Sequence, residues 1–377
     1  MPLVTRRKLG FIVNPIAGMG GRVGLKGTDG DEILQMAIDR GATPSSPERA
    51  IEALRRAESI RNSLQLITCP EMMGEAEAVL CGFVPEVISS VGKGRTSAVD
   101  TKRAAEHMLA VGVDLILFAG GDGTARDILD VVGDRVPALG IPAGVKIHSA
   151  AFAISPRCAG NLAVAFLQGE SASLQEAEVM DVDEQAFRDG KVVARLYGYL
   201  KVPFEKTMVQ SGKVGSSAQE ERLFESIASD VIEHMDDKTA YIIGPGTTTR
   251  RIMDGLGLQK TLLGVDVVQA GSLLASDVNE SQLLKIVANH LTKIVVSVIG
   301  GQGFVFGRGS QQISSDVIRK VGRENIVIVA TPRKLASLKG ASLLVDTGDE
   351  QVDRMLEGHM SVVTGHGKRA MYRVKAV

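Results

Sequence analysis

The stretch Asp114-Leu-Ile-Leu-Phe-Ala-Gly-Gly-Asp-Gly-Thr-Ala-Arg-Asp127 says most about the fold of this chain. Its apolar run, Leu115–Ala119, is typical of a buried strand and is too short for a free-standing helix. The run ends in Gly120-Gly-Asp-Gly-Thr124, and a helical pattern follows. Glycines at a strand-to-helix turn let the backbone approach a ligand closely, and the helix start offers unpaired N–H groups to an anion. The stretch therefore predicts a strand, a phosphate-binding loop and a helix in succession.

Asp122 is the only carboxylate inside this loop. A carboxylate among groups that favour phosphate is explained if it holds a metal ion or takes a proton from a hydroxyl, and this combination suggests phosphoryl transfer. The alternative is an ordinary turn, because Gly-Gly-Asp-Gly is a plausible turn sequence and Asp is favoured at helix starts. Asp127 completes a capping-box pattern that begins at Thr124, so it is interpreted as a helix cap.

Strand and helix patterns alternate through the first part of the chain. Strands are predicted over 9–13, 64–68, 84–90, 115–119 and 138–141, and helices over 31–40, from Ser45 onward, over 75–81 and over 97–109. Such alternation indicates a parallel sheet with its ligand loops at the carboxyl ends of the strands. We therefore expect the loops Asn14–Gly21, Gly120–Thr124 and Pro142–Lys146 to lie on one edge of that sheet and to line a shared cleft.

The remaining sequence changes character twice. Residues 179–199 are typical of a hairpin with its turn at Asp189-Gly190, and an amphipathic helix follows over 217–235. Alternation then resumes, with strands predicted over 241–243, 262–268, 293–299, 326–330 and 343–345. The predicted fold class is α/β, with an N-terminal parallel-sheet domain over 1–165, a short β-rich connecting segment over 166–236 and a second α/β domain over 237–377.

Two glycine-rich loops follow strands of the C-terminal part. The first, Gly244-Pro-Gly-Thr-Thr-Thr-Arg250, makes Gly244, Gly246, Thr247 and Thr248 candidate contacts for a phosphate or nucleotide, and the alternative is that its threonines only cap the next helix. The second loop spans Gly300–Gly309 and has the weaker pattern. Several other polar residues are interpreted as structural: His148 as a helix-start residue, Asp29 as part of a turn, and Glu71, Glu75 and Asp100 as helix caps.

Composition excludes several classes of function. The 377 residues carry 43 basic and 44 acidic side chains, with 4% aromatic residues and no Trp, so no basic footprint or stacking surface predicts nucleic acid or an anionic membrane as a partner. Three cysteines without metal-ligand spacing are typical of reduced thiols. No signal peptide and no apolar run of about 20 residues is recognisable. We expect a cytoplasmic protein that forms a homo-oligomer and has small-molecule nucleotides as partners.

Gly-Gly-Asp-Gly-Thr after an apolar strand resembles the signature of the NAD kinase superfamily, which includes diacylglycerol and sphingosine kinases and, more distantly, 6-phosphofructokinases. Asn14-Pro-Ile-Ala-Gly18 resembles the phosphate-side loop of these kinases, and Pro142–Lys146 stands where they continue toward the nucleotide site. The stretch Gly20–Asp29 and the long C-terminal extension look like the prokaryotic branch described as ATP-NAD kinase-like or AcoX-like. The resemblance covers about the first 160 residues well and the rest loosely.

The resemblance implies a kinase that uses ATP (or polyphosphate) and Mg²⁺ and phosphorylates a nucleotide hydroxyl, most simply converting NAD to NADP. It implies that Asp122 is the catalytic residue and the metal ligand. The loop residues that would contact the phosphates are Asn14, Gly18, Gly20, Gly21, Gly120, Gly121, Gly123 and Thr124. The alternatives are a kinase that acts on another small-molecule or lipid alcohol, and a non-enzymatic sensor of a phosphorylated metabolite.

One departure from the family pattern concerns the residues that hold the nucleotide acceptor. NAD kinases carry an Asn-Glu or Asn-Asp pair in the second domain that holds the nucleotide. The only Asn-Glu here is Asn279-Glu280, which precedes a helical pattern and is interpreted as a helix start.

Overall fold

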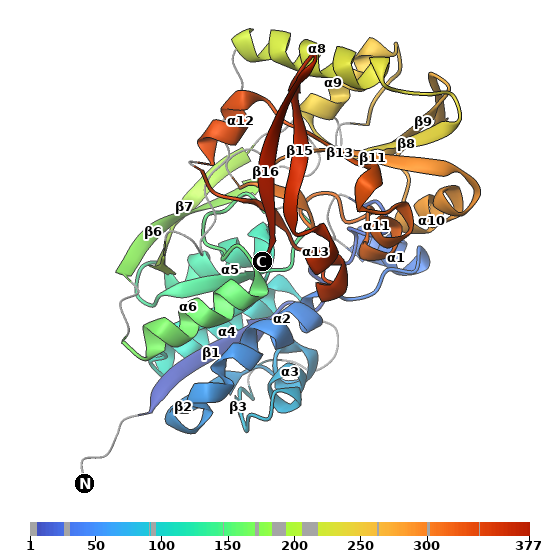
Figure 1. Cartoon of the computed structure of the whole chain (residues 1–377). Coiled ribbons are helices and arrows are strands. Elements are labelled where there is room, and N and C mark those ends of the chain that lie inside the picture. Colours follow the sequence, from blue (N-terminus) through green and yellow to red (C-terminus); the bar gives the residue numbers. More distant parts are fainter. Residues whose placement is uncertain are drawn as a thin grey trace. The chain divides into compact units, whose positions relative to one another are not determined.

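Two units make up the chain in a computed structural model (Figure 1). The first comprises Met1–Met19 and Gly27–Gly212, and the second comprises Gly20–Lys26 and Lys213–Val377. The structure describes residues 6–25, 31–89, 91, 96–145, 147–169, 173–182, 194–205, 218–261, 264–299, 302–338 and 340–377.

The first unit is built on a five-stranded parallel sheet with the strand order β3-β2-β1-β4-β5, which confirms the expected α/β class. Its strands are β1 (Arg7–Val13), β2 (Leu64–Thr68), β3 (Glu86–Val87), β4 (Leu115–Gly120) and β5 (Ala138–Pro142). Its helices are α1 (Asp31–Asp39), α2 (Ser46–Arg55), α3 (Glu75–Leu80), α4 (Ala98–Ala110), α5 (Asp122–Val132) and α6 (Pro156–Leu167), with 3₁₀ turns η1 (Arg56–Ser63) and η2 (Glu71–Met73).

Helices cover both faces of this sheet because successive strand residues point to opposite sides. On β4, Leu115 and Leu117 pack with α2, α3 and α6, whereas Ile116 and Phe118 pack with α4 and α5. The order of the strands reverses at β1, so β1 and β4 mark the switch point of the sheet. In open α/β sheets ligands bind outside the carboxyl ends of the strands at such a point.

The β-rich middle of the chain is a two-stranded antiparallel sheet of β6 (Ser173–Val182) and β7 (Ala194–Phe204). Its buried side chains, such as Val179 and Val202, join the same core cluster as α4 and α5. The predicted turn at Asp189-Gly190 lies outside the described residues. This hairpin belongs to the first unit, and the following helix α8 (Ala218–Glu233) belongs to the second.

The second unit contains a nine-stranded mixed sheet with the order β10-β9-β8-β11-β13-β15-β16-β14-β12. The strands are β8 (Thr239–Ile243), β9 (Asp266–Gln269), β10 (Ser272–Ala275), β11 (Leu291–Ser297), β12 (Phe304–Phe306), β13 (Ile326–Val329), β14 (Leu343–Val345), β15 (Gly358–Gly365) and β16 (Lys368–Ala376). Adjacent strands β8, β11, β13 and β15 are parallel to one another, whereas β15 and β16 form an antiparallel hairpin.

Helices also cover this second sheet on two faces. One core cluster combines α8 and α9 (Thr247–Gly255) with the strand residues Ile243, Val295 and Val329. The other cluster contains the neighbouring strand residues Ile242 and Ile294, packed with helices α10 (Glu280–Asn289), α11 (Ser315–Val321), α12 (Pro332–Ser337) and α13 (Glu350–Leu356). A 3₁₀ turn, η3 (Arg323–Asn325), precedes β13.

Several local predictions were wrong in detail. The strand predicted over 84–90 shrinks to Glu86–Val87, and the one predicted over 262–268 begins at Asp266. The second glycine-rich stretch is interrupted by β12, and the predictions missed β10, β15 and β16. Ser45 precedes α2 as its N-cap but makes no side-chain capping hydrogen bond. The Ser97–Asp100 capping box of α4 is confirmed.

Glu77 on α3 carries a buried carboxyl group, and we expect this group to make the stability of the folded protein depend on pH. It is 2% exposed, and within the described residues its Oε2 has no hydrogen-bond partner. Burial raises the pKa of Glu77 to about 7, against weaker lowering by the backbone N–H groups of Glu77 and Gly74. Because the pKa is raised on folding, its contribution to stability is fully present below the unfolded pKa of about 4.5 and is lost as the pH rises through about 7.

We expect wild-type protein to lose of the order of 3 kcal/mol of unfolding free energy between pH 5 and pH 8 through this group, at 1.36 kcal/mol per pKa unit. Urea unfolding at both pH values measures the loss, and Glu77→Gln should remove it. Glu75→Gln on the same helix is the matched control, because Glu75 is partly exposed and its Oε2 already accepts a hydrogen bond from Glu71 N. Equal pH dependence in the wild type and in Glu77→Gln would contradict the expectation.

Candidate active site

The loops that follow β1, β4 and β5 contact one another at the carboxyl edge of the first sheet. Asn14 N, just after β1, donates to Ala119 O of β4 at 2.9 Å. Ala143 N and Gly144 N, after β5, donate to Gly120 O at 2.9 and 3.0 Å. The three predicted motif loops therefore meet within the first unit, apart from Gly20 and Gly21, which belong to the second unit, and Lys146, which lies outside the described residues.

Two close backbone approaches in this region require glycine. Gly18 has a φ of +79°, and a Cβ added there would lie 2.0 Å from Ala143 O. A Cβ on Gly144 would lie 2.8 Å from the Cα of Gly121. Any side chain at these positions would push the loops apart, so the glycines keep the backbone of the three loops together.

Asp122 is the first residue of α5, where Gly121 is the N-cap in an extended conformation. Its side chain is 8% exposed. Its Oδ2 accepts a hydrogen bond from His148 N at 2.8 Å, and its Oδ1 accepts one from Ser149 N at 3.0 Å. His148 Nδ1 lies 3.3 Å from the same Oδ2. The carboxylate is therefore held in one orientation by the backbone that follows β5.

His148 and Ser149 connect this carboxylate to the β6–β7 hairpin. The Oγ of Ser149 donates to Met180 O at 2.9 Å and accepts from Met180 N at 3.0 Å, and Ala150 N donates to Glu178 O at 2.8 Å. No helix begins at His148, so its interpretation as a helix-start residue was wrong: the next helix begins at Pro156. Sequence reasoning missed Ser149, because a lone serine after a strand carries no pattern.

Asn14 and Thr124 join the first loop to α5. Asn14 Nδ2 donates to Thr124 Oγ1 at 3.0 Å, and its Oδ1 accepts from Ile16 N at 3.3 Å. Because α5 already begins at Asp122, Thr124 lies inside the helix, and Asp127 does not cap it as predicted. Asp127 is buried instead, and its Oδ1 lies 3.7 Å from Lys102 Nζ. Burial raises the pKa of the Asp127 carboxyl group.

Arg49 on α2 is a cation that the sequence reasoning did not single out. Its Nη1 donates to Pro142 O at the end of β5, at 3.1 Å. It lies within the helix start that follows Ser45, where the pattern indicated only capping. The contact places a guanidinium group beside the loop after β5.

Gly20 and Gly21 belong to the second unit, unlike the rest of the first motif loop. A Cβ on Gly21 would lie 3.1 Å from Gln311 Cβ. In the same unit Glu280 N donates to Arg22 O at 3.0 Å. Asn279 caps α10 in a capping box with Gln282, so the interpretation of Asn279-Glu280 as a helix start is confirmed.

The loop after β8 uses its threonines within the second unit. Gly246 is the N-cap of α9 and gives no side-chain cap. Thr249 Oγ1 donates to Gly244 O at 2.7 Å and lies 3.0 Å from Gly246 O. Thr248 Oγ1 accepts from Lys334 Nζ at 2.9 Å, whereas Thr247 is exposed.

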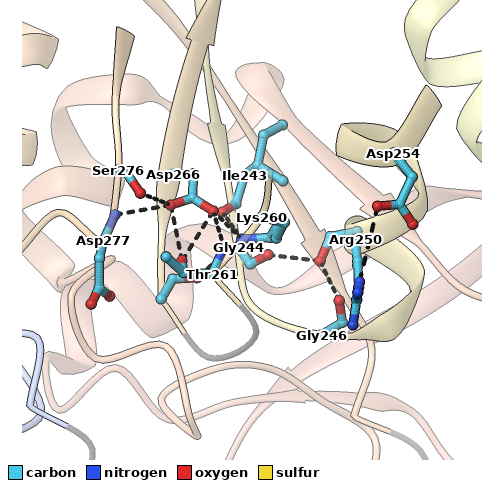
Figure 2. Close-up of polar contacts among 12 residues, drawn as sticks. Ile243, Gly244, Gly246, Arg250, Asp254, Lys260, Thr261, Asp266, Ser276 and Asp277 are labelled. Carbon is cyan, nitrogen blue, oxygen red and sulfur yellow. Dashed lines mark hydrogen bonds and ion pairs between the residues drawn. The ribbon is translucent and has the colours of Figure 1, made fainter. Parts of the chain in front are cut away.

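A buried ion pair lies beside the end of β8, from which this loop starts, as Figure 2 shows. Lys260 Nζ and Asp266 Oδ2 are 2.9 Å apart, and both side chains are fully buried. The ammonium also donates to the carbonyl oxygens of Ile243 (3.3 Å) and Gly264 (3.1 Å). Asp266 further accepts hydrogen bonds from Thr261 N and Oγ1, Ser276 Oγ and Asp277 N.

The donors around Asp266 determine its ionisation. Burial alone raises the pKa of Asp266, but the charge of Lys260 and the hydrogen bonds from Asp277 N, Lys260 and Thr261 hold that pKa below its usual value. The carboxylate is therefore charged and fully hydrogen-bonded. Its donors come from the segments before and after the β9–β10 hairpin, and its partner Lys260 also contacts the end of β8.

Among the residues that the structure describes, no group of three or more His, Cys, Asp or Glu side chains is arranged to hold a metal ion. In the same described part of the chain, no helix combines the length and the apolar character needed to cross a membrane.

Comparison with known proteins identifies two family models along the chain. Residues 9–171 match the ATP-NAD kinase N-terminal domain, and residues 236–374 match the ATP-NAD kinase C-terminal domain. The two matches together span most of the sequence. No curated protein matches the chain.

Similar solved structures come from Bacillus anthracis str. Sterne. Two of them are each described as a putative diacylglycerol kinase, and their sequences are 15% and 16% identical to this chain. Each match covers 48% of this chain, and the matches cover 47% and 44% of the two solved chains. Both have a TM-score of 0.24. A third, described as a diacylglycerol kinase, shares 13% identity, covers 51% of this chain and 62% of its own, and has a TM-score of 0.22. The chain thus spans less than two thirds of the length of these structures.

Proposed function

Because this chain belongs to the ATP-NAD kinase family, we propose that it transfers a phosphoryl group from ATP (or polyphosphate) to a hydroxyl of a nucleotide. The family comprises phosphotransferases whose acceptor is an alcohol. The acceptor that we propose is the adenosine ribose 2′-hydroxyl of NAD, which would give NADP. The observation that carries the proposal is the buried Asp122 carboxylate at the N-terminus of α5, beside the glycine loops after β1 and β5.

In this proposal the loops bind the phosphates and Asp122 handles the proton. Asn14 and Gly18 of the first loop, with Gly120, Gly121, Gly123 and Thr124 of the second, would place N–H groups and small side chains around the phosphate oxygens. Gly20 and Gly21 are assigned to the same task from the family pattern. Arg49 adds a guanidinium beside the third loop, where it would neutralise phosphate charge.

Asp122 has two possible tasks that its geometry supports. The N–H groups of His148 and Ser149 each use one lone pair of a carboxylate oxygen, so further lone pairs are left for another partner. One of these would accept the proton of the attacking hydroxyl or bind Mg²⁺. A single carboxylate fits Mg²⁺, because this ion is often held by one or two carboxylates, with water and substrate phosphates as its other ligands. Bound there, it would neutralise phosphate charge.

A substrate panel tests the proposal. Purified protein is incubated with Mg²⁺ and either ATP or polyphosphate, and with NAD, NADH, a diacylglycerol or other small alcohols, and mass spectrometry identifies the phosphorylated product. We expect NADP from NAD with wild-type protein and none with Asp122→Asn. A phosphorylated product from the diacylglycerol or another alcohol, with none from NAD or NADH, would replace the proposed acceptor. No product from any acceptor would overturn the proposed kinase activity.

A further inference from the structure

The β15–β16 hairpin leaves one face of β16 exposed. In the hairpin Val363 of β15 is paired with Arg369 of β16, and directly paired residues point to the same face of a sheet. Val363 packs in the core cluster that contains α8, so Arg369 also points to the α8 side of the sheet. Every second residue of β16 shares this side, and these side chains are all exposed: Arg369, Met371, Arg373 and Lys375. This side of β16 is therefore a basic row (Arg369, Arg373 and Lys375) around Met371, which is 64% exposed.

Helix α8 is fixed against the tip of the same hairpin (Figure 1). His366 N donates to Ser226 Oγ at 2.9 Å, and Gly367 N donates to Asp230 Oδ1 at 2.8 Å. Arg369 Nη2, at the start of the basic row, donates to Asp230 Oδ2 at 3.1 Å. These contacts hold α8 beside β16 within the second unit, so the exposed side chains of the helix and the basic row lie on the same side of the sheet.

The helix and the strand carry opposite charges. β16 contains four basic residues and no acidic residue, whereas α8 contains five acidic residues and one basic residue. Three of these acidic residues form an acidic ridge along α8, because they are four or eight residues apart, and each is at least partly exposed: Glu221, Glu225 and Glu233. Residues four apart on a helix repeat every 6 Å or about that, and outward residues on a strand repeat every 7 Å or about that. The acidic ridge and the basic row therefore match in spacing as well as in charge.

We propose that two copies of the chain associate through this side of the sheet, with the acidic ridge of each copy on the basic row of the other. A two-fold contact needs a self-complementary surface, and one axis satisfies both rows at once because they lie side by side in one unit. Met371 would supply apolar contact between the charged rows. A second copy fits better than an unrelated acidic protein, which would leave the acidic ridge without a counterpart. The proposal goes beyond the kinase activity, because its residues all belong to the second unit.

Sedimentation velocity of the full-length protein over a range of concentrations tests the proposal. The variants are Arg373→Glu in the basic row, Glu225→Lys in the acidic ridge and Lys285→Glu as the matched control. Lys285 is an exposed lysine of the same unit, but it lies on α10, which packs against the opposite face of the sheet. Each substitution occurs twice in a symmetric dimer, so a single change reverses the charge at two contacts.

We expect the wild type and Lys285→Glu to form dimers that weaken as the salt concentration rises, because salt screens exposed charges. Arg373→Glu and Glu225→Lys should each raise the dissociation constant of the dimer by about 10-fold or more, because like charges then face each other. An equimolar mixture of these two variants should associate as tightly as the wild type, since the facing charges are again opposite in sign.

Circular dichroism identifies the variants that are folded, and Met371→Asp provides a second test of β16 if Arg373→Glu fails to fold. A wild type that stays monomeric, wild-type association in the folded variants of both rows, or no association in the mixture of folded Arg373→Glu and Glu225→Lys would overturn the proposal. Association is measured without substrate, so failure of the kinase proposal would leave this result unchanged.

Discussion

Asp122→Asn is expected to lower kcat by about 10²-fold or more while the protein stays folded. The substitution keeps the size of the side chain but removes the charge that would accept a proton or bind Mg²⁺. It also turns an NH₂ group toward His148 N or Ser149 N, each of which now donates to a carboxylate oxygen. The lost hydrogen bond should cost about 1–3 kcal/mol of stability, which circular dichroism and melting temperature measure beside the steady-state kinetics.

Asp127→Asn provides the matched control for this experiment. Asp127 lies on the same helix, is buried to a similar extent and faces Lys102 instead of the loops. The same change of carboxylate to amide there should affect stability and leave kcat near the wild-type value. An unchanged kcat in Asp122→Asn would reduce Asp122 to a helix-start residue and remove the central support of the proposed mechanism.

Lys260→Met is expected to lower the unfolding free energy of the second unit by about 3–5 kcal/mol. The substitution leaves the Asp266 carboxylate buried without a counter-charge, because the two side chains form a fully buried pair (Figure 2). It also leaves the carbonyl oxygens of Ile243 and Gly264 without their donor. Hydrogen exchange of Thr261 N and Asp277 N, which both donate to Asp266, measures the local loss.

Two further variants separate charge from packing in this experiment. Lys260→Met combined with Asp266→Asn removes the uncompensated charge, so it should be less destabilised than Lys260→Met alone. Lys285→Met, on the exposed side of α10, should change the unfolding free energy by less than about 0.5 kcal/mol. A loss under about 1 kcal/mol in Lys260→Met would show that the pair is not the stabilising contact that its burial indicates.

Sequence patterns predicted correctly those elements whose structure is determined by residues close together in the sequence. The apolar run Leu115–Ala119 and the glycines after it predicted β4 and its loop, because a buried parallel strand shows as a continuous apolar stretch. Ser97 and Asp100 predicted the start of α4 through the capping box that the structure contains. The homo-oligomer, the cytoplasmic location and the roles assigned to individual site residues stay predictions.

Patterns failed where distant segments decide the structure. β16 is a different case, because its buried Val374 and its partly buried Ala370, Tyr372 and Ala376 alternate with exposed residues. The alternation of a strand was therefore present in the sequence and was overlooked, and only the pairing of β16 with β15 and β14 depends on distant segments. The contacts of Asp122 with His148 and Ser149 depend on how β5 places the following segment against α5. The Lys260–Asp266 pair was missed although its two residues are close in the sequence, because neither stands in a recognisable motif.

The assignment of Gly20–Lys26 to the second unit has a consequence for biosynthesis. This segment leaves the ribosome long before Glu280 and Gln311, which contact it within the second unit. These contacts join residues that are far apart in the sequence, so they form only after the chain has been synthesised past Gln311. A gene fragment that begins at Lys213 would encode this unit without one of its own pieces, so expressing it alone should give a less stable product than the full-length chain.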